Sequence, residues 1–141
     1  MAVEKCEGDL EQFIFLMRQP DSFWEEDSAP KLLPNPNIIN LFREKRHLLK
    51  CSRFLRGLMF QIMEGVKFLH DNKIIHRDLK PQNILINRLL KAKISDMGLS
   101  KQLNTEMESY HTEAVKGSIG WQPAEVILNE ADYVFKNTHK T

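Results

Sequence analysis

His76-Arg77-Asp78-Leu79-Lys80-Pro81-Gln82-Asn83 is the stretch that decides the fold of this 141-residue chain, and Asp96-Met97-Gly98 follows it. The two segments together supply Asp78, Asn83 and Asp96, three side chains with hard oxygen donors. Magnesium prefers such ligands, and a carboxylate also accepts a proton. A set of this kind at this spacing is typical of a site that transfers a phosphate group to a hydroxyl.

Each residue of the set has an expected role. We expect Asp78 to orient and deprotonate the incoming hydroxyl, and Lys80 to stabilise charge on the transferred phosphate. Asp96 is the predicted principal magnesium ligand, and Asn83 is a second ligand through its amide oxygen. Arg77 is a support that can also grip a phosphate placed on the segment after Asp96.

The surrounding pattern predicts a helix followed by a hairpin. Residues 51 to 69 carry apolar side chains at helical spacing: Leu55, Leu58, Met59, Ile62, Val66 and Leu69. Met59 and Met63 are expected to fill the core. Residues 84–86 and 92–95 are predicted strands joined by a turn at 87–91, which places Asn83 and Asp96 at adjacent ends of one hairpin.

The N-terminal third is predicted to hold one short helix and a long connection. Asp9 and Gln12 have capping-box spacing, and Pro20 ends the helix. Residues 19 to about 50 contain several prolines and are expected to connect elements, with a short helical turn near residues 38–42. The aromatic pair Phe23 and Trp24 packs locally or binds a partner, and local packing is favoured.

Charge and cysteine content exclude several classes of protein. The formal net charge is +1, so no strong field points to nucleic acid, and the basic residues at 43–47 are expected to form a solvated face. Two scattered cysteines, Cys6 and Cys51, do not make a disulfide framework. We find no apolar run long enough to cross a membrane and no signal peptide, which favours the cytoplasm.

Residues 97 to 120 lack strong periodicity and are expected to form a flexible regulatory segment. Its candidate hydroxyls for phosphorylation are Ser100, Thr105, Ser109, Thr112 and Ser118.

Residues 3 to about 130 resemble the middle of a eukaryotic-type protein kinase domain, and Lys80 gives the loop its serine/threonine-kinase form. The motifs Pro81-Gln82-Asn83-Ile84-Leu85-Ile86, Ile94-Ser95-Asp96-Met97-Gly98 and Gly120-Trp121-Gln122 resemble the inositol-requiring unfolded-protein-response kinase/endoribonuclease sensors. The resemblance implies an α+β fold: the mainly helical large lobe, truncated, with a short β-hairpin at the catalytic loop. Residues 1–141 then form a partial domain, from hinge to activation segment, without the small lobe and the C-terminal helices.

The resemblance also implies ligands and partners. ATP and Mg²⁺ are the expected cofactors, held by Lys80, Asn83 and Asp96, with the hinge residues Glu4 and Cys6 at the adenine. The acceptor is a protein hydroxyl, on a substrate or on the chain itself. A homodimer with a full-length relative is expected, at the cytosolic face of the endoplasmic reticulum membrane. No nucleic acid is expected to bind this segment.

The sequence departs from the kinase pattern at several points. No G-x-G-x-x-G phosphate loop occurs, the lysine of the small lobe has no candidate, and Pro123-Ala124-Glu125 reverses the usual Ala-Pro order. Without those positioning contacts, we expect the isolated chain to be inactive or nearly so. The alternative function is a non-catalytic, kinase-like interaction module. Ribonuclease action is rejected for this segment.

Overall fold

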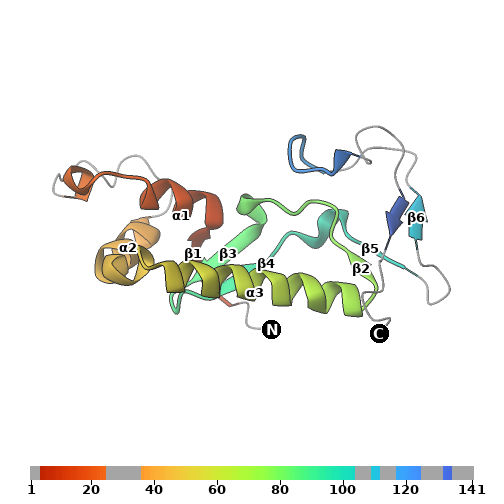
Figure 1. Ribbon diagram of the computed structural model, residues 1–141, viewed down its shortest axis with the longest axis horizontal. Helices are drawn as coiled ribbons and strands as arrows, with labels where there is room; N and C mark the ends of the chain where they lie inside the picture. Colours follow the sequence, from red (N-terminus) through yellow and green to blue (C-terminus); the bar gives the residue numbers. More distant parts are fainter. Residues whose placement is uncertain (1–3, 25–35, 104–108, 112–116, 125–131, 135–141) are drawn as a thin grey trace. The chain divides into compact units, whose positions relative to one another are not determined.

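The computed structural model describes residues 4–24, 36–103, 109–111, 117–124 and 132–134 (Figure 1). The chain divides into two compact units, which are described in turn. The first comprises Met1–Gly65 and Pro81–Ser95, and the second comprises Val66–Lys80 and Asp96–Thr141. Helices α1, α2 and α3 follow one another along the chain, and the described strands form short antiparallel sheets, so the predicted α+β class is confirmed.

The first unit contains a three-stranded antiparallel sheet in the order β1-β3-β4. Its strands are β1 (Cys6–Asp9), β3 (Ile84–Asn87) and β4 (Ala92–Ile94), which lie side by side in Figure 1. The register pairs Ile84 with Ile94, which confirms the hairpin expected from the sequence. Strand β1 adds to the other edge of β3, so residues near the N-terminus lie against the hairpin.

Helix α1 (Leu10–Met17) begins where the sequence predicts it. The Asp9 side chain accepts a hydrogen bond from the Gln12 backbone N–H at 2.9 Å, and the Gln12 side chain accepts one from the Asp9 N–H at 3.3 Å. This reciprocal pair satisfies two backbone donors at the helix start. The helix ends at Met17, three positions before Pro20, and a 3₁₀ helix begins directly after that proline.

Helix α2 (Pro36–Leu49) corrects the prediction of a long connection with only a short helical turn. Pro36 does not break the structure here, because proline is favoured in the first turn of a helix, where its missing N–H costs nothing. The basic residues at 43–47 continue this helix: Arg43 and His47 are exposed, and Lys45 and Arg46 are half-buried, so none of them is buried in the core. Burial of the opposite face stabilises all fourteen residues as one helix.

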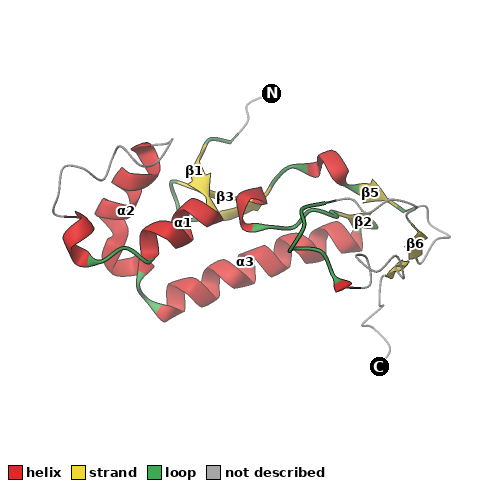
Figure 2. Ribbon diagram, turned by 90° about the horizontal axis from the view of Figure 1, so that it is seen from above, coloured by secondary structure: helices red, strands yellow, loops and turns green. Residues whose placement is uncertain are grey.

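The core of the first unit lies where α1 and α2 pack against each other (Figure 2). Its fully buried side chains are Phe13, Leu16, Ile38, Ile39, Phe42, Leu49 and Ile86. The rings of Phe13 and Phe42 meet edge to face, with centroids 5.4 Å apart. Trp24, in the 3₁₀ helix η1 (Asp21–Trp24), stacks on Phe42 at 4.9 Å, so the local packing expected of this tryptophan is confirmed.

Helix α3 (Ser52–Asp71) matches the predicted helix to within two residues at each end and contributes to both units. Leu58 is buried, and the Gln61 side chain accepts a hydrogen bond from the Ala92 N–H at 3.0 Å, which ties the helix to β4. The prediction that Met59 and Met63 fill the core is wrong, because they are 56% and 66% exposed. Their exposure means that they lie outside the part of the α3 surface that the rest of the first unit covers.

The second unit contains two short antiparallel pairs. Strand β2 (Ile74–Ile75) pairs with β5 (Lys101–Gln102), and β6 (Ser109–His111) pairs with β7 (Asp132–Val134). The 3₁₀ helix η4 (Met97–Leu99) precedes β5. Among the residues described, no helix is both long enough and apolar enough to span a bilayer.

Candidate active site

The loop that carries Asp78 leaves strand β2, whose pairing with β5 fixes where the loop starts. A backbone hydrogen bond from the Leu103 N–H to the Lys73 carbonyl, 2.8 Å long, extends the same pairing. Arg77 then adopts a left-handed backbone conformation, with φ of 67°. Such a conformation is uncommon for a residue with a Cβ and turns the chain sharply, so that Asp78 is directed inward.

The Asp78 carboxylate is the centre of a hydrogen-bonded cluster within the second unit. It is 7% exposed, and its Oδ1 accepts a hydrogen bond of 2.8 Å from the Ser118 backbone N–H. Its Oδ2 lies 3.1 Å from the Lys80 Nζ, which donates in turn to the Ser118 Oγ at 2.5 Å. The Asp78 N–H donates to the Nδ1 of buried His76 at 3.2 Å. The structure therefore holds the predicted base and the predicted cation together.

These contacts keep the carboxylate charged. Burial raises the pKa of Asp78, but hydrogen bonds from Ser118 and Lys80 and the lysine charge lower it by more, to about 2. Asp78 is therefore ionised throughout the physiological range. It accepts hydrogen bonds rather than donating them, as a group that orients a hydroxyl must.

The lowered pKa predicts how folding stability depends on pH. Because the pKa of Asp78 falls from 3.8 to about 2 on folding, its contribution is complete above pH 4 and disappears as the pH falls toward 2. Replacing Lys80 by methionine removes one cause of the lowering, so the free energy of unfolding is expected to change less steeply over that interval. Urea titrations at several pH values measure this slope.

Lys67→Met is the matched control for that measurement. Lys67 pairs with Asp71 on the exposed surface of α3, and its loss is expected to leave the slope as in the wild type. Equal slopes for Lys80→Met and the wild type would contradict the assigned role of Lys80.

Arg77 connects the loop to the segment after Asp96. Its Nε–H donates to the backbone carbonyl of Leu99, the last residue of η4, at 2.5 Å. The predicted grip on a phosphorylated side chain stays a prediction. What the structure adds is that the guanidinium also supports the backbone of η4.

Asp96 lies at the start of η4, and its chemistry fits a metal ligand. Its φ is 56°, its side chain is exposed, and its Oδ1 accepts a long hydrogen bond, 3.3 Å, from the Gly98 N–H. Within the described part of the chain, no lysine or arginine forms an ion pair with it. An exposed carboxylate without a protein cation is the kind of group that holds Mg²⁺, which needs few protein ligands.

Asn83, the other predicted magnesium ligand, belongs to the first unit. It ends the 3₁₀ helix η3 (Pro81–Asn83), is 5% exposed, and directly precedes β3. Its backbone carbonyl accepts hydrogen bonds from Ser95, at 2.8 Å from the backbone N–H and 3.0 Å from Oγ. Among the described residues, no group of three or more His, Cys, Asp or Glu side chains could hold a metal ion.

The predicted hinge residues lie along the first unit's sheet. The Glu4 carboxylate accepts a hydrogen bond from Asn87 at 2.5 Å and pairs with Lys93 at 3.2 Å; these two contacts lower its pKa. Its side chain is thus occupied by the hairpin. Cys6 is half-buried at the start of β1, and burial raises the pKa of its thiol. Adenine binding by either residue stays a prediction.

One polar pocket of about 240 Å³ is lined from β1, α2 and the hairpin turn. Its lining includes Lys5, Glu7 and Arg88 but none of the predicted site residues. This pocket is therefore not the site that the loop chemistry indicates.

The five candidate hydroxyls have different surroundings. Ser100 Oγ donates to the Met97 carbonyl at 2.7 Å, and Ser109 lies in β6. Thr105 and Thr112 lie outside the described residues. Ser118 is the residue whose contact the sequence did not predict, because it binds Lys80 and Asp78 across about forty residues of chain. The only sequence signal for it was its position between Gly117 and Gly120.

A model of the protein kinase domain matches residues 21–138. The match covers well over half of the chain and includes the whole Asp78–Asp96 region, so this chain belongs to the protein kinase domain family. The kinase resemblance expected from the sequence is confirmed.

Named relatives refine the comparison. The chain is 41% identical over 141 residues to the serine/threonine-protein kinase/endoribonuclease IRE1b of Arabidopsis thaliana. This alignment covers 92% of this chain and 16% of the relative. The chain is 49% identical over 80 residues to the serine/threonine-protein kinase/endoribonuclease IRE1a of the same plant, an alignment that covers 55% of this chain and 10% of the relative. The serine/threonine-protein kinase SSN3 of Candida albicans is 33% identical over 134 residues, covering 94% and 18%. The chain thus spans less than a fifth of these relatives' length.

Proposed function

We propose that this chain is the phosphoryl-transfer segment of a serine/threonine protein kinase of the kinase/endoribonuclease type. The observation that carries the proposal is the contact of Asp78 with both Lys80 and Ser118 inside one unit. It supplies an ionised acceptor and a cation side by side. Family membership supports the same reaction class.

In the proposed reaction, the oxygen of a serine or threonine hydroxyl forms a bond to the γ-phosphorus of ATP. The bond between that phosphorus and the oxygen bridging to the β-phosphate breaks, and ADP leaves. The hydroxyl proton passes to Asp78. A carboxylate with a pKa of about 2 is a weak base, so Asp78 mainly orients the hydroxyl and takes the proton late.

Lys80 neutralises charge on the phosphate during transfer, from its position 3.1 Å from Asp78. Asp96 and Asn83 are the proposed holders of Mg²⁺. When bound, magnesium supplies charge neutralisation at the β- and γ-phosphate oxygens. His76 and Arg77 fix the loop through the Asp78 N–H and the Leu99 carbonyl.

The protein substrate or the chain itself supplies the hydroxyl, and a homodimer with a full-length relative is part of the proposal. From the same resemblance, we propose that the parent protein lies at the cytosolic face of the endoplasmic reticulum membrane. Because this sequence has no Gly-rich phosphate loop, the isolated chain is expected to transfer phosphate very slowly.

A chimera, in which this chain replaces the matched segment of the Arabidopsis relative IRE1b, supplies the contacts that the isolated chain lacks. In the chimera, Asp96→Ala is expected to weaken magnesium-dependent ATP binding by at least about 10-fold, because a hard oxygen ligand is lost. Isothermal titration calorimetry with and without Mg²⁺ measures the change. Asp71→Ala, which removes an exposed carboxylate of α3, is the control. Equal affinities for Asp96→Ala and the control would contradict the metal assignment.

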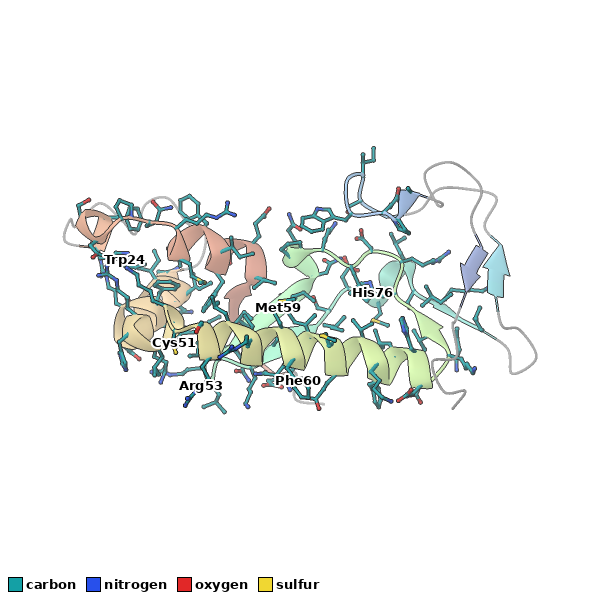
Figure 3. All side chains as sticks on the ribbon, in the orientation of Figure 1. Trp24, Cys51, Arg53, Met59, Phe60 and His76 are labelled. Atoms are coloured by element: carbon teal, nitrogen blue, oxygen red, sulfur yellow. The ribbon has the colours of Figure 1, made fainter. Side chains whose placement is uncertain are left out.

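A non-catalytic interaction module is the second candidate, and one observation favours it. Met59, Phe60 and Met63 are each more than half exposed on α3, and Phe60 projects away from the helix in Figure 3. Exposed apolar groups of this kind often mark contact surfaces. Sedimentation of the 141-residue chain with and without a kinase relative tests this candidate. A monomer that binds no kinase would count against it.

A further inference from the structure

We propose that Gly117 is a positioning residue for Asp78: its missing side chain lets Ser118 come close enough to hold the carboxylate. The inference rests on the proposed function, since Asp78 matters as the group that orients the acceptor hydroxyl. It adds a residue outside the loop and outside η4 to the machinery of transfer.

The close approach at Gly117 is a contact between two stretches of backbone. A Cβ on Gly117 would lie closer than 3.0 Å to the carbonyl oxygen of Arg77, a separation that real Cβ atoms essentially never show. It would also lie 3.2 Å from Nε2 of Gln122. A side chain can swing away from such a clash, but the Arg77 carbonyl cannot, because Arg77 is itself held in a left-handed conformation.

The position of the clash determines what would move. Arg77 precedes Asp78, and Gly117 precedes Ser118, so the carbonyl of Arg77 and the Ser118 N–H belong to the same approach of two segments. The Ser118 N–H lies 2.8 Å from Asp78 Oδ1, and the Ser118 Oγ lies 2.5 Å from Lys80 Nζ. Hydrogen bonds weaken steeply once the atoms separate by several tenths of an ångström, so a segment pushed outward loses both.

The loss would be visible at Asp78 itself. Burial raises the pKa of this carboxyl, and the Ser118 and Lys80 contacts lower it to about 2. Without the Ser118 contacts, fewer interactions counteract the effect of burial, and the pKa of Asp78 rises toward its ordinary value of 3.8. The ionisation of Asp78 therefore reports how well Ser118 is placed.

Gly117→Ala and Gly120→Ala form a matched pair in the 141-residue chain. Both glycines have positive φ, 109° and 90°, so both substitutions strain the backbone, but a Cβ at Gly120 meets no atom within 4 Å. NMR titration of the side-chain carboxyl carbon of Asp78 from about pH 6 to about pH 3 is the measurement. We expect Gly117→Ala to raise the pKa of Asp78 and Gly120→Ala to leave it as in the wild type. An unchanged pKa in Gly117→Ala, or an equal rise in both, would overturn the proposal.

Ser118→Ala tests whether Gly117 acts through its neighbour. Because the alanine keeps the backbone N–H, Ser118→Ala is expected to raise the pKa of Asp78 less than Gly117→Ala does. The double variant is expected to match Gly117→Ala alone, since the contact is already lost. Additive shifts would mean that Gly117 acts elsewhere and would also overturn the proposal.

Gly117→Asn repeats the test with a residue that tolerates positive φ better than alanine, in case Gly117→Ala does not fold. If both variants unfold while Gly120→Ala folds, Gly117 serves the fold rather than the site, and the proposal fails. The titration needs no nucleotide. The chimera can therefore be an active kinase even if Gly117→Ala leaves the pKa of Asp78 unchanged. Conversely, Gly117→Ala can raise that pKa even if the chimera is inactive.

Discussion

Asp78→Asn is expected to lower kcat for phosphate transfer by the chimera about 10²–10⁴-fold, the range that loss of a positioned proton acceptor usually gives. Asparagine keeps the shape of the side chain, but its neutral amide cannot take the hydroxyl proton. The KM for ATP is expected to change little, because Asp78 contacts the acceptor hydroxyl rather than the nucleotide in the proposed reaction. Steady-state kinetics with a protein substrate measures both constants.

The design of that experiment separates chemistry from folding. Asp71→Asn makes the same chemical change on the exposed surface of α3 and is expected to leave kcat as in the unmodified chimera. The asparagine at residue 78 also loses its ion pair with Lys80, so circular dichroism must show that the variant is folded. A folded Asp78→Asn chimera with less than a tenfold loss in kcat would remove Asp78 from the mechanism.

Phe42→Ala is expected to destabilise the 141-residue chain by about 3–5 kcal/mol, the usual cost of deleting a buried aromatic side chain. Phe42 is fully buried in α2, where it meets Phe13 edge to face and carries the stacked ring of Trp24. Truncation leaves a cavity at the contact of α1 and α2 and removes the support of η1. Urea unfolding followed by tryptophan fluorescence measures the loss.

Phe60→Ala is the matched control for this stability prediction. It removes the same ring from α3, but at a position 62% exposed, where the expected change is within about 0.5 kcal/mol. If the two alanine variants were equally stable, the first unit would not be organised around Phe42.

Local signals in the sequence predicted local structure well. The capping box at Asp9 and Gln12 placed the start of α1, and the apolar spacing placed α3. The hairpin of β3 and β4 also followed from the sequence, because two short segments containing isoleucine flank the turn at residues 87–91. Each of these features depends on residues close together in the chain.

The predictions that were wrong concern residues whose type is compatible with two different structural environments. Proline ends a helix at most positions but is favoured in its first turn. The pattern around Pro36 therefore did not predict the full length of α2. Met59 and Met63 fit the helical stripe by spacing, but spacing does not show how wide a surface the rest of the unit covers. A side chain on the correct face can still lie beyond the covered part of that face.

The candidate site was predictable in its residues and not in its contacts. Asp78 and Lys80 are two positions apart, so their proximity was implied by the loop. The third member, Ser118, arrives from a distant segment, and its approach depends on the absence of a side chain at Gly117. A sequence shows that a glycine has no side chain, but it does not show which backbone segment occupies the space that a side chain would need.

Transfer of the γ-phosphate by the chimera tests most directly whether this chain supplies the phosphoryl-transfer residues of a protein kinase. The chimera is incubated with γ-labelled ATP, Mg²⁺ and a protein substrate, beside the unmodified Arabidopsis relative. We expect magnesium-dependent label on serine or threonine, within about tenfold of the relative's rate, because Asp78, Lys80, Asn83 and Asp96 are all present in this chain. A folded chimera that binds ATP with Mg²⁺ but transfers no label would contradict this expectation.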